Sequence, residues 1–205
     1  MSVLVVDPLT CDALIEQRRL TGGDRYDEVW DGLYVANPLG SVEHQRMVME
    51  LCLAFGRVVD DAGLGTVLPG ANVASFEENW KNDFRCPDVV VVLTGGRARD
   101  IGAAWIGGPD FLVEIRSPGE KATDKLPFYE RVGVRELLVV DRDTKDAELF
   151  RLQDGKLISV GTSSNAGRAV LLSEVLPLSF ARGSDADRPQ LIVHRTDGRE
   201  SSWRV

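Results

Sequence analysis

The clearest pattern of apolar and polar positions lies between Ser41 and Gly63. Apolar side chains recur there every three or four residues, the spacing of one face of an α-helix. They are Val48, Leu51, Cys52, Phe55, Val58 and Val59. Ser41 suits an N-cap, Glu43 adds a negative charge to the first turn, and Gly63 suits the end of the helix. The segment is therefore predicted to be an amphipathic helix.

Three apolar runs further along the chain predict buried strands: VVVVL at 89–93, DFLVEIR at 110–116 and RELLVVD at 135–141. The first run has four β-branched residues without polar alternation, which is typical of a strand covered on both faces. A short helix from about Asp124 to Val132 is expected between the last two strands. Other elements must therefore pack above and below this sheet.

Shorter strands are expected to pair around turn residues. Asp31-Gly32 lies within 26–36 and Asp154-Gly155 within 148–160, and an Asp-Gly pair favours a tight hairpin. Residues 65–76 predict a broken pair of strands around Pro69-Gly70, followed by a polar loop at 77–85. This order of elements predicts a mixed α/β fold: a mixed sheet flanked by helices on both faces, with an extra N-terminal hairpin.

The length of 205 residues fits a single domain over 1–205. Residues 1–25 are predicted to form a helical lead-in, with a short helix at 12–20. Residues 181–205 form a polar tail, interrupted by the apolar LIVH at 191–194. That run is compatible either with an edge strand or with a flexible end.

Composition narrows the class of protein. Apolar residues make up 43% and charged residues 27% of the chain, the balance of a folded globular protein. No run of about 18 apolar residues exists and no signal peptide is recognisable, so we expect a cytoplasmic protein without a membrane span. Cys11, Cys52 and Cys86 are an odd number without a CxxC pair, which favours free thiols over disulfides or a zinc site.

The net charge of −8 is unevenly distributed. Residues 1–80 carry five Lys and Arg against thirteen Asp and Glu, whereas the rest of the chain is close to neutral. An acidic protein repels phosphate backbones at long range, which argues against tight non-specific DNA binding. It does not exclude a nuclease, because a bound cation and a local basic patch can dominate at close range.

Two acids are the strongest candidates for chemistry. Glu114 lies within an apolar strand, where an unpaired carboxylate costs several kcal/mol, and Asp88 lies where the neighbouring strand begins. If the two strands pair, both carboxylates reach one site, and hard oxygen ligands suit Mg²⁺ or Mn²⁺. Two structural interpretations stay open: an ion pair of Glu114 with Arg116, and a strand-capping role for Asp88.

The helix after the Glu114 strand supplies a third candidate, Lys125. Because Pro127 must fall in the first turn, Asp124 is expected as the N-cap and Lys125 at the first helical position. Tyr129 then lies on the same helix face as Lys125. A lysine aimed at an acidic pair could orient the attacking water and stabilise charge on a phosphate. The alternative is an ordinary solvated surface lysine.

Other chemistries find little support. The glycines at 94–108 lack the spacing and lysine of a phosphate-binding loop, and no GxSxG occurs. His44 and His194 are the only histidines, which excludes a histidine-rich metal site. Trp30, Trp80 and Trp105 could stack on bases, although tryptophans at such positions are more often core or lid residues.

The ordered set Pro87-Asp88, Glu114-Ile115-Arg116-Ser117-Pro118, Lys125 and Tyr129 resembles the PD-(D/E)xK nuclease superfamily. More narrowly, residues 26–180 resemble the Uma-two family of putative restriction endonucleases, also known as a domain of unknown function. The similarity includes the segments YDEVWDGLYV, SVEHQRMVMEL, CPDVVVV, GGPDFLVEIRSP, YERVGVRELLVVD and EVLPLSF.

The resemblance implies a restriction-endonuclease-like core with a divalent metal, Mg²⁺ or Mn²⁺, held by Asp88 and Glu114. It also implies a further metal-binding acid at Glu43, with His44 beside the site, and places the family's helix lysine at Lys125. Arg116 stands where the superfamily has a lysine. Since arginine stays protonated, it can only neutralise charge or bind phosphate. The lysine role therefore passes to Lys125, with Lys121 as the weaker substitute, or it is lost.

Two functions are therefore compatible with the sequence. The first is a metal-dependent endonuclease that hydrolyses nucleic acid, with DNA as the expected substrate, and that uses the set Asp88, Glu114, Lys125, Arg116 and Tyr129. A homodimer would suit cleavage of two strands. The second is a catalytically inactive nuclease-like scaffold that binds nucleic acid or another protein.

Overall fold

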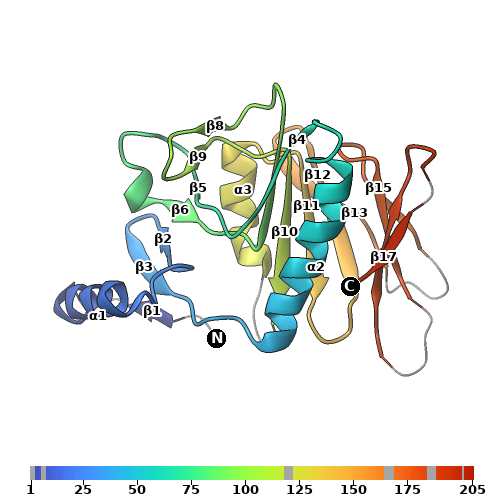
Figure 1. Cartoon of the computed structure of the whole chain (residues 1–205). Helices are drawn as coiled ribbons and strands as arrows, with labels where there is room; N and C mark the ends of the chain where they lie inside the picture. The colour runs from blue at the N-terminus through green and yellow to red at the C-terminus, as the bar shows by residue number, and fades with distance from the viewer. Residues whose placement is uncertain (1–2, 6–7, 118–121, 164–168, 184–187, 200) are drawn as a thin grey trace.

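A computed structural model describes the chain except residues 1–2, 6–7, 118–121, 164–168, 184–187 and 200 (Figure 1). The described residues form three β-sheets and three α-helices. No helix among them is long and apolar enough to cross a membrane. The predicted fold class, a mixed α/β fold, is confirmed.

The central sheet has six strands in the order β13-β12-β11-β10-β7-β4. Their bounds are β4 Gly65–Pro69, β7 Val89–Leu93, β10 Phe111–Arg116, β11 Glu136–Asp141, β12 Ala147–Gln153 and β13 Lys156–Thr162. Strands β10 and β11 are parallel, and the other neighbours in this sheet are antiparallel. The sheet is therefore mixed. Strands β7 and β10, which position the candidate acids Asp88 and Glu114, lie side by side.

A helix covers each face of this sheet. Helix α2 (Val42–Val58) packs on one face together with Val89 and Val91, whereas α3 (Leu126–Val132) packs on the other face with Val90 and Val92. The four valines of β7 thus serve two hydrophobic cores. This burial on both sides explains why their run contains no polar alternation.

A seven-stranded sheet lies beside α3 and carries the N-terminal hairpin, drawn in blue in Figure 1. Its strands are β1 Val3–Val5, β2 Glu28–Trp30, β3 Leu33–Ala36, β5 Val73–Ala74, β6 Phe84–Arg85, β8 Arg99–Asp100 and β9 Trp105–Ile106. Asp31 and Gly32 have φ angles of 48° and 86°, as the tight turn between β2 and β3 requires. Helix α1 (Pro8–Thr21) lies between β1 and β2 along the chain.

The third sheet is formed by β14 Leu171–Leu172, β15 Leu178–Arg182, β16 Leu191–Arg195 and β17 Ser202–Arg204. The LIVH run of the tail forms β16. It is not an edge strand, because β15 pairs with one side of it and β17 with the other. Leu191 and Val193 are fully buried in the core beneath α2, so this part of the tail belongs to the fold.

Two predicted boundaries differ from the structure. Residues Ala122–Lys125 form a 3₁₀ turn (η2), so Asp124 is not the N-cap; Lys125 occupies that position, and α3 starts at Leu126. The predicted polar loop at 77–85 contains a second 3₁₀ turn, η1 (Trp80–Asn82), and strand β6. Two-residue strands such as β6 depend on tertiary pairing and leave no periodic signal in the sequence.

Candidate active site

The antiparallel pairing of β7 and β10 brings Asp88 and Glu114 to one end of the sheet. Val89 lies opposite Val113, so Asp88 and Glu114 are the next residues along their strands. The backbone N–H of Ile115 donates to Asp88 Oδ2 at 2.6 Å, which fixes the aspartate to the neighbouring strand. The predicted juxtaposition therefore rests on a direct contact between the two strands.

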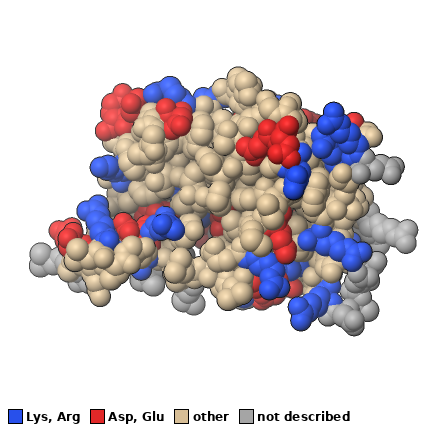
Figure 2. Space-filling model, in the orientation of Figure 1, with Lys and Arg blue, Asp and Glu red and all other residues tan. Residues whose placement is uncertain are grey.

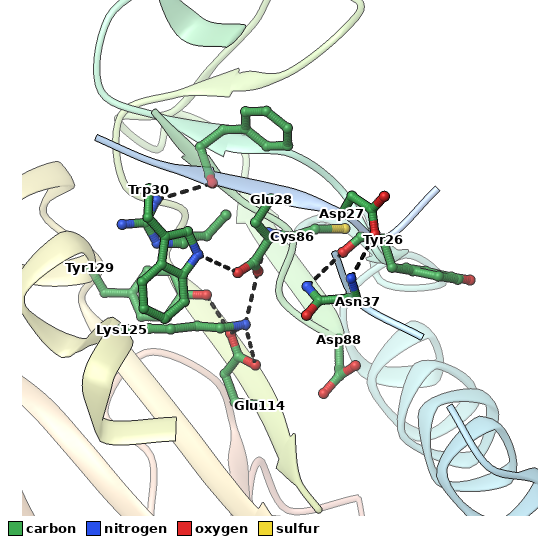
Figure 3. A network of polar contacts seen from close by, with 12 residues as sticks. Tyr26, Asp27, Glu28, Trp30, Asn37, Cys86, Asp88, Glu114, Lys125 and Tyr129 are labelled. Atoms are coloured by element: carbon green, nitrogen blue, oxygen red, sulfur yellow. Dashed lines mark hydrogen bonds and ion pairs between the residues drawn. The ribbon is translucent and has the colours of Figure 1, made fainter. Parts of the chain in front are cut away.

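Lys125 joins Glu114 to a second buried acid (Figure 3). Its Nζ donates to Glu114 Oε1 at 3.0 Å and Oε2 at 3.1 Å, and to Glu28 Oε1 at 2.9 Å. The Tyr129 hydroxyl donates to Glu114 Oε1 from the next turn of the same helix. Lys125 is therefore part of the site rather than a solvated surface lysine.

Glu28 comes from strand β2 of the N-terminal hairpin and is fully buried. Trp30 Nε1 donates to its Oε2 at 2.7 Å, and the backbone N–H of Cys86 donates to its Oε1 at 2.9 Å. Together with Lys125, these groups provide a hydrogen-bond donor to each carboxylate oxygen of Glu28. Sequence reasoning missed Glu28; the one available signal was an acid between apolar residues in the predicted strand DEVW.

Arg85 clamps the hairpin that carries Glu28 onto helix α3. Its guanidinium lies 4.6 Å from the ring centroid of Trp30 and 4.3 Å from that of Phe128. It also donates to the Val29 carbonyl at 2.8 Å. A buried arginine between two aromatic rings holds β2 and α3 together, and so holds Glu28 against Lys125.

The pKa values of Glu114 and Lys125 depend both on burial and on the charges of their neighbours. Burial raises the pKa of Glu114 to about 7, with Asp88 and Glu28 adding to the rise and Lys125 opposing it. Burial alone would lower the pKa of Lys125, but the charges on Glu114 and Glu28 outweigh it and raise that pKa. Lys125 is thus held protonated and acts as a donor, not as a base.

His44 contacts Asp88 from the other side. Ser41 accepts a hydrogen bond from the His44 backbone N–H and so caps α2 as predicted. From this first turn, His44 Nε2 lies 2.8 Å from Asp88 Oδ1. Asp88 therefore connects α2 to β10, and its carboxylate carries interactions on both oxygens.

Glu43 does not join the two central acids. Its carboxylate accepts from Lys145 Nζ at 2.6 Å, and this hydrogen bond lowers the pKa of Glu43. Lys145 is buried and belongs to the turn between β11 and β12. Adjacent helix positions point about 100° apart, so with His44 facing Asp88, Glu43 faces that turn instead.

Arg116 has a different partner from the expected one. Its guanidinium donates to Asp141 Oδ2 at 2.9 Å across the parallel pair β10–β11, and its side chain is 46% exposed. The interpretation of Glu114 and Arg116 as an ion pair is therefore wrong, because Lys125 takes that place beside Glu114. Lys121 lies outside the described residues.

The donor set bears on the kind of metal that the site could hold. Asp88 and Glu114 offer hard oxygen atoms, and Mg²⁺ is commonly bound by one or two carboxylates with waters and phosphates completing its shell. The described residues contain no group of three His, Cys, Asp or Glu side chains placed to hold a metal. The pair thus fits a Mg²⁺-type ion better than a closed protein cage of the zinc type.

Three basic side chains act on Glu43 in the first turn of α2, the turn that also carries His44. Lys145, Arg46 and Arg188 each contribute positive charge that lowers the pKa of Glu43. In Figure 2, blue and red side chains are interspersed over this face of the molecule. The surroundings of the candidate site are therefore mixed in charge, although the whole chain is acidic.

The fold of this chain is shared with a solved structure. A crystal structure of a putative nuclease belonging to DUF820 from Anabaena variabilis ATCC 29413 is similar, with a TM-score of 0.57 and 15% sequence identity. The similarity covers 73% of this chain and 82% of that protein. It shows that the two chains share a fold.

The family follows from the sequence itself. Residues 15–186 match the model of the Uma2 family, described as "Putative restriction endonuclease", and the chain belongs to this family. No curated protein matches the chain. The resemblance inferred from the ordered motifs is thereby confirmed.

Proposed function

We propose that this protein is a metal-dependent endonuclease that hydrolyses phosphodiester bonds of DNA. The observation that carries the proposal is the convergence of Asp88, Glu114 and Lys125 at one end of the central sheet. Glu114 and Lys125 are both largely buried, and their arrangement requires contacts between three separate elements. Such a costly set of buried charges favours a functional site over a purely structural one.

Asp88 and Glu114 would hold Mg²⁺ or Mn²⁺. When bound there, the cation would supply an acidified water and neutralise charge on the scissile phosphate. Lys125, kept protonated by two carboxylates, would donate a hydrogen bond to the attacking water or to a phosphate oxygen. Tyr129 would hold Glu114 in place through Oε1, and the Ile115 N–H and His44 would do the same for Asp88.

Arg116 contributes a positive charge at the solvent-exposed edge of the candidate site. Half of its side chain is exposed, and Asp141 fixes one end of the guanidinium without burying it. It would therefore bind a phosphate of the substrate strand rather than compensate Glu114. Arg46 and Arg188 support the same assignment, because they add positive charge near Glu43 at the start of α2.

Cleavage of supercoiled plasmid DNA with Mg²⁺ or Mn²⁺ tests this proposal. We expect wild-type protein to nick the plasmid, and Asp88→Asn, Glu114→Gln and Lys125→Met each to lower the rate at least 100-fold, since each removes a group acting on the reacting atoms. Asp61→Asn is the matched control, because Asp61 is an exposed acid at the far end of α2. Equal residual cleavage by all variants would point to a contaminating nuclease and contradict the assignment.

One observation favours the alternative of a non-catalytic scaffold. Lys125 already neutralises Glu114, and no cluster of three metal-binding side chains occurs in the described part of the chain. Calorimetric titration with Mn²⁺ separates the two functions: heat of binding that Glu114→Gln abolishes supports the enzyme, and no heat supports the scaffold. A homodimeric state and a cytoplasmic location stay predictions.

A further inference from the structure

A pocket of about 300 Å³ opens beside the candidate active site. It lies where the turn of the β2–β3 hairpin meets η1 and the exposed side of α3. The side chains that matter here are Asp31, Asp83, Arg131, Phe76, Asn79 and Asn82. None of them takes part in the contacts among Glu28, Lys125 and Glu114.

The pocket is built on the same elements as the site. Asp31 follows Glu28 by three residues along the hairpin, a span of about 10 Å at about 3.3 Å per residue. Arg131 follows Lys125 by six residues along α3, a span of about 9 Å. Stacked nucleotides advance about 3.4 Å per step, so the pocket lies about three steps from a phosphate bound at Lys125.

The charges in the pocket disfavour a phosphate as its ligand. The Arg131 guanidinium contacts the Asp83 carboxylate and lies 3.7 Å from Asp31 Oδ1. Its charge is thus already balanced by two acids. Asp31 is 75% exposed and keeps accepting capacity, which suits a neutral ligand that presents N–H donors.

The remaining groups fit a planar ring. Phe76 is 64% exposed, so its ring is accessible to a ligand in the pocket. The side-chain amides of Asn79 and Asn82 are exposed and make no hydrogen bond to another described residue. An exposed aromatic ring and two available amides match the needs of a nucleobase, which stacks on its face and hydrogen-bonds at its edge.

We propose that this pocket binds an unpaired base of the substrate strand and that it prefers guanine. This inference rests on the proposed function for its substrate class. Guanine presents two adjacent N–H donors, N1–H and the 2-amino group, to the Asp31 carboxylate, and its carbonyl oxygen accepts from an asparagine amide. Phe76 provides the stacking surface. The pocket would thus fix the position of the strand relative to Asp88 and Glu114.

Binding of single-stranded DNA without divalent cations tests the proposal independently of cleavage. The probes are fluorescein-labelled thymidine dodecamers, with or without one central guanosine, and the readout is fluorescence anisotropy. We expect wild-type protein to bind the guanosine probe about tenfold more tightly. Phe76→Ala should weaken that binding about tenfold, and Asp31→Asn should remove the preference for guanosine.

The variants are chosen to leave the fold intact. Asp31 has a positive φ of 48°, a conformation that asparagine also tolerates, so Asp31→Asn preserves the turn. Phe76 is exposed, so its loss leaves no cavity. Ile158→Ala is the matched control, because Ile158 is an exposed apolar residue on the outer strand β13 and its loss should not change binding.

The outcomes separate this inference from the proposed function. Equal affinity of wild type for both probes, no binding to either, or unchanged binding by Phe76→Ala would overturn the pocket assignment, even if the protein cuts plasmid DNA. Guanosine-dependent binding that Phe76→Ala removes would support the pocket, even if no cleavage occurs with Mg²⁺.

Discussion

Glu114 carries its charge at a position where burial makes ionisation costly. Lys125 and Tyr129 compensate part of this cost, yet the pKa of Glu114 is still raised to about 7 from 4.5. An acid with a raised pKa binds its proton more tightly in the folded state. The stability of the metal-free protein should therefore fall as the pH rises from about 4.5 through about 7.

Replacing this acid should stabilise the protein while removing its proposed activity. Above pH 7 we expect Glu114→Gln to raise the free energy of unfolding by about 1 to 2 kcal/mol, because an amide avoids the buried charge. At pH 5 the difference should be small, since Glu114 is then protonated. Urea denaturation in EDTA at pH 5 and pH 8 measures both values.

Glu43→Gln is a control for which the expected effect on stability has the opposite sign. Lys145 lowers the pKa of Glu43, so this carboxylate stabilises the protein above its unfolded pKa, and the contribution is lost as the pH falls. Glu43→Gln should consequently not stabilise the protein at pH 8. A loss of stability in Glu114→Gln at pH 8 would instead identify a structural ion pair.

Among the elements, α3 is tightly constrained in its position. Gly108 packs against the end of this helix, where a Cβ atom would lie 2.3 Å from the carbonyl carbon of Gly133. The contact is with backbone, which cannot move aside as a flexible side chain can. Because α3 carries Tyr129 and follows Lys125 directly, the position of this helix sets the geometry of the site.

A methyl group at Gly108 should therefore disturb both stability and function. We expect Gly108→Ala to lower the free energy of unfolding by about 1 to 3 kcal/mol and to slow DNA cleavage as Lys125 shifts. Gly56→Ala in α2 is the control, because its Cβ would meet only the Asp60 carboxylate at 3.4 Å. It should add about 0.5 to 1 kcal/mol of stability. Equal stability of Gly108→Ala and wild type would contradict the tight packing.

At the scale of the whole molecule, the core extends beyond the segment matched by the family model. That segment ends at residue 186, yet β16 contributes Leu191 and Val193 to the core under α2. The third sheet thereby covers the face of the central sheet that also bears α2. The C-terminal strands are thus part of the core on which α2, the helix that carries His44, packs.

Truncation of a side chain in β16 should reveal this support. We expect Leu191→Ala to lower the free energy of unfolding by about 2 to 4 kcal/mol, since it leaves a cavity in a fully buried place. Leu172→Ala, at a 57% exposed position on β14, should change stability by less than about 0.5 kcal/mol. Chemical denaturation of both variants measures the difference; similar values would show that β16 is dispensable.

Local signals in the sequence predicted most of the helices and strands. Within the candidate site they indicated Asp88, Glu114 and Lys125, but not Glu28. The valine run, the Asp-Gly turns and the Ser41 cap each act over a few residues, so they could be assigned without tertiary information. The pairing of Asp88 with Glu114 was predictable as well, because adjacent buried strands align their ends. Lys125 followed from its place on the helix directly after β10.

Tertiary structure alone decided which other charges enter the site. Glu28 meets Lys125 across 97 residues of sequence, through a hairpin clamped by Arg85. Glu43 turns away to Lys145, and Arg116 to Asp141, because the rotation of α2 and the register of β10 with β11 select one partner among several acids and bases. Sequence fixes which groups are available within an element; only the packing of elements fixes which of them meet.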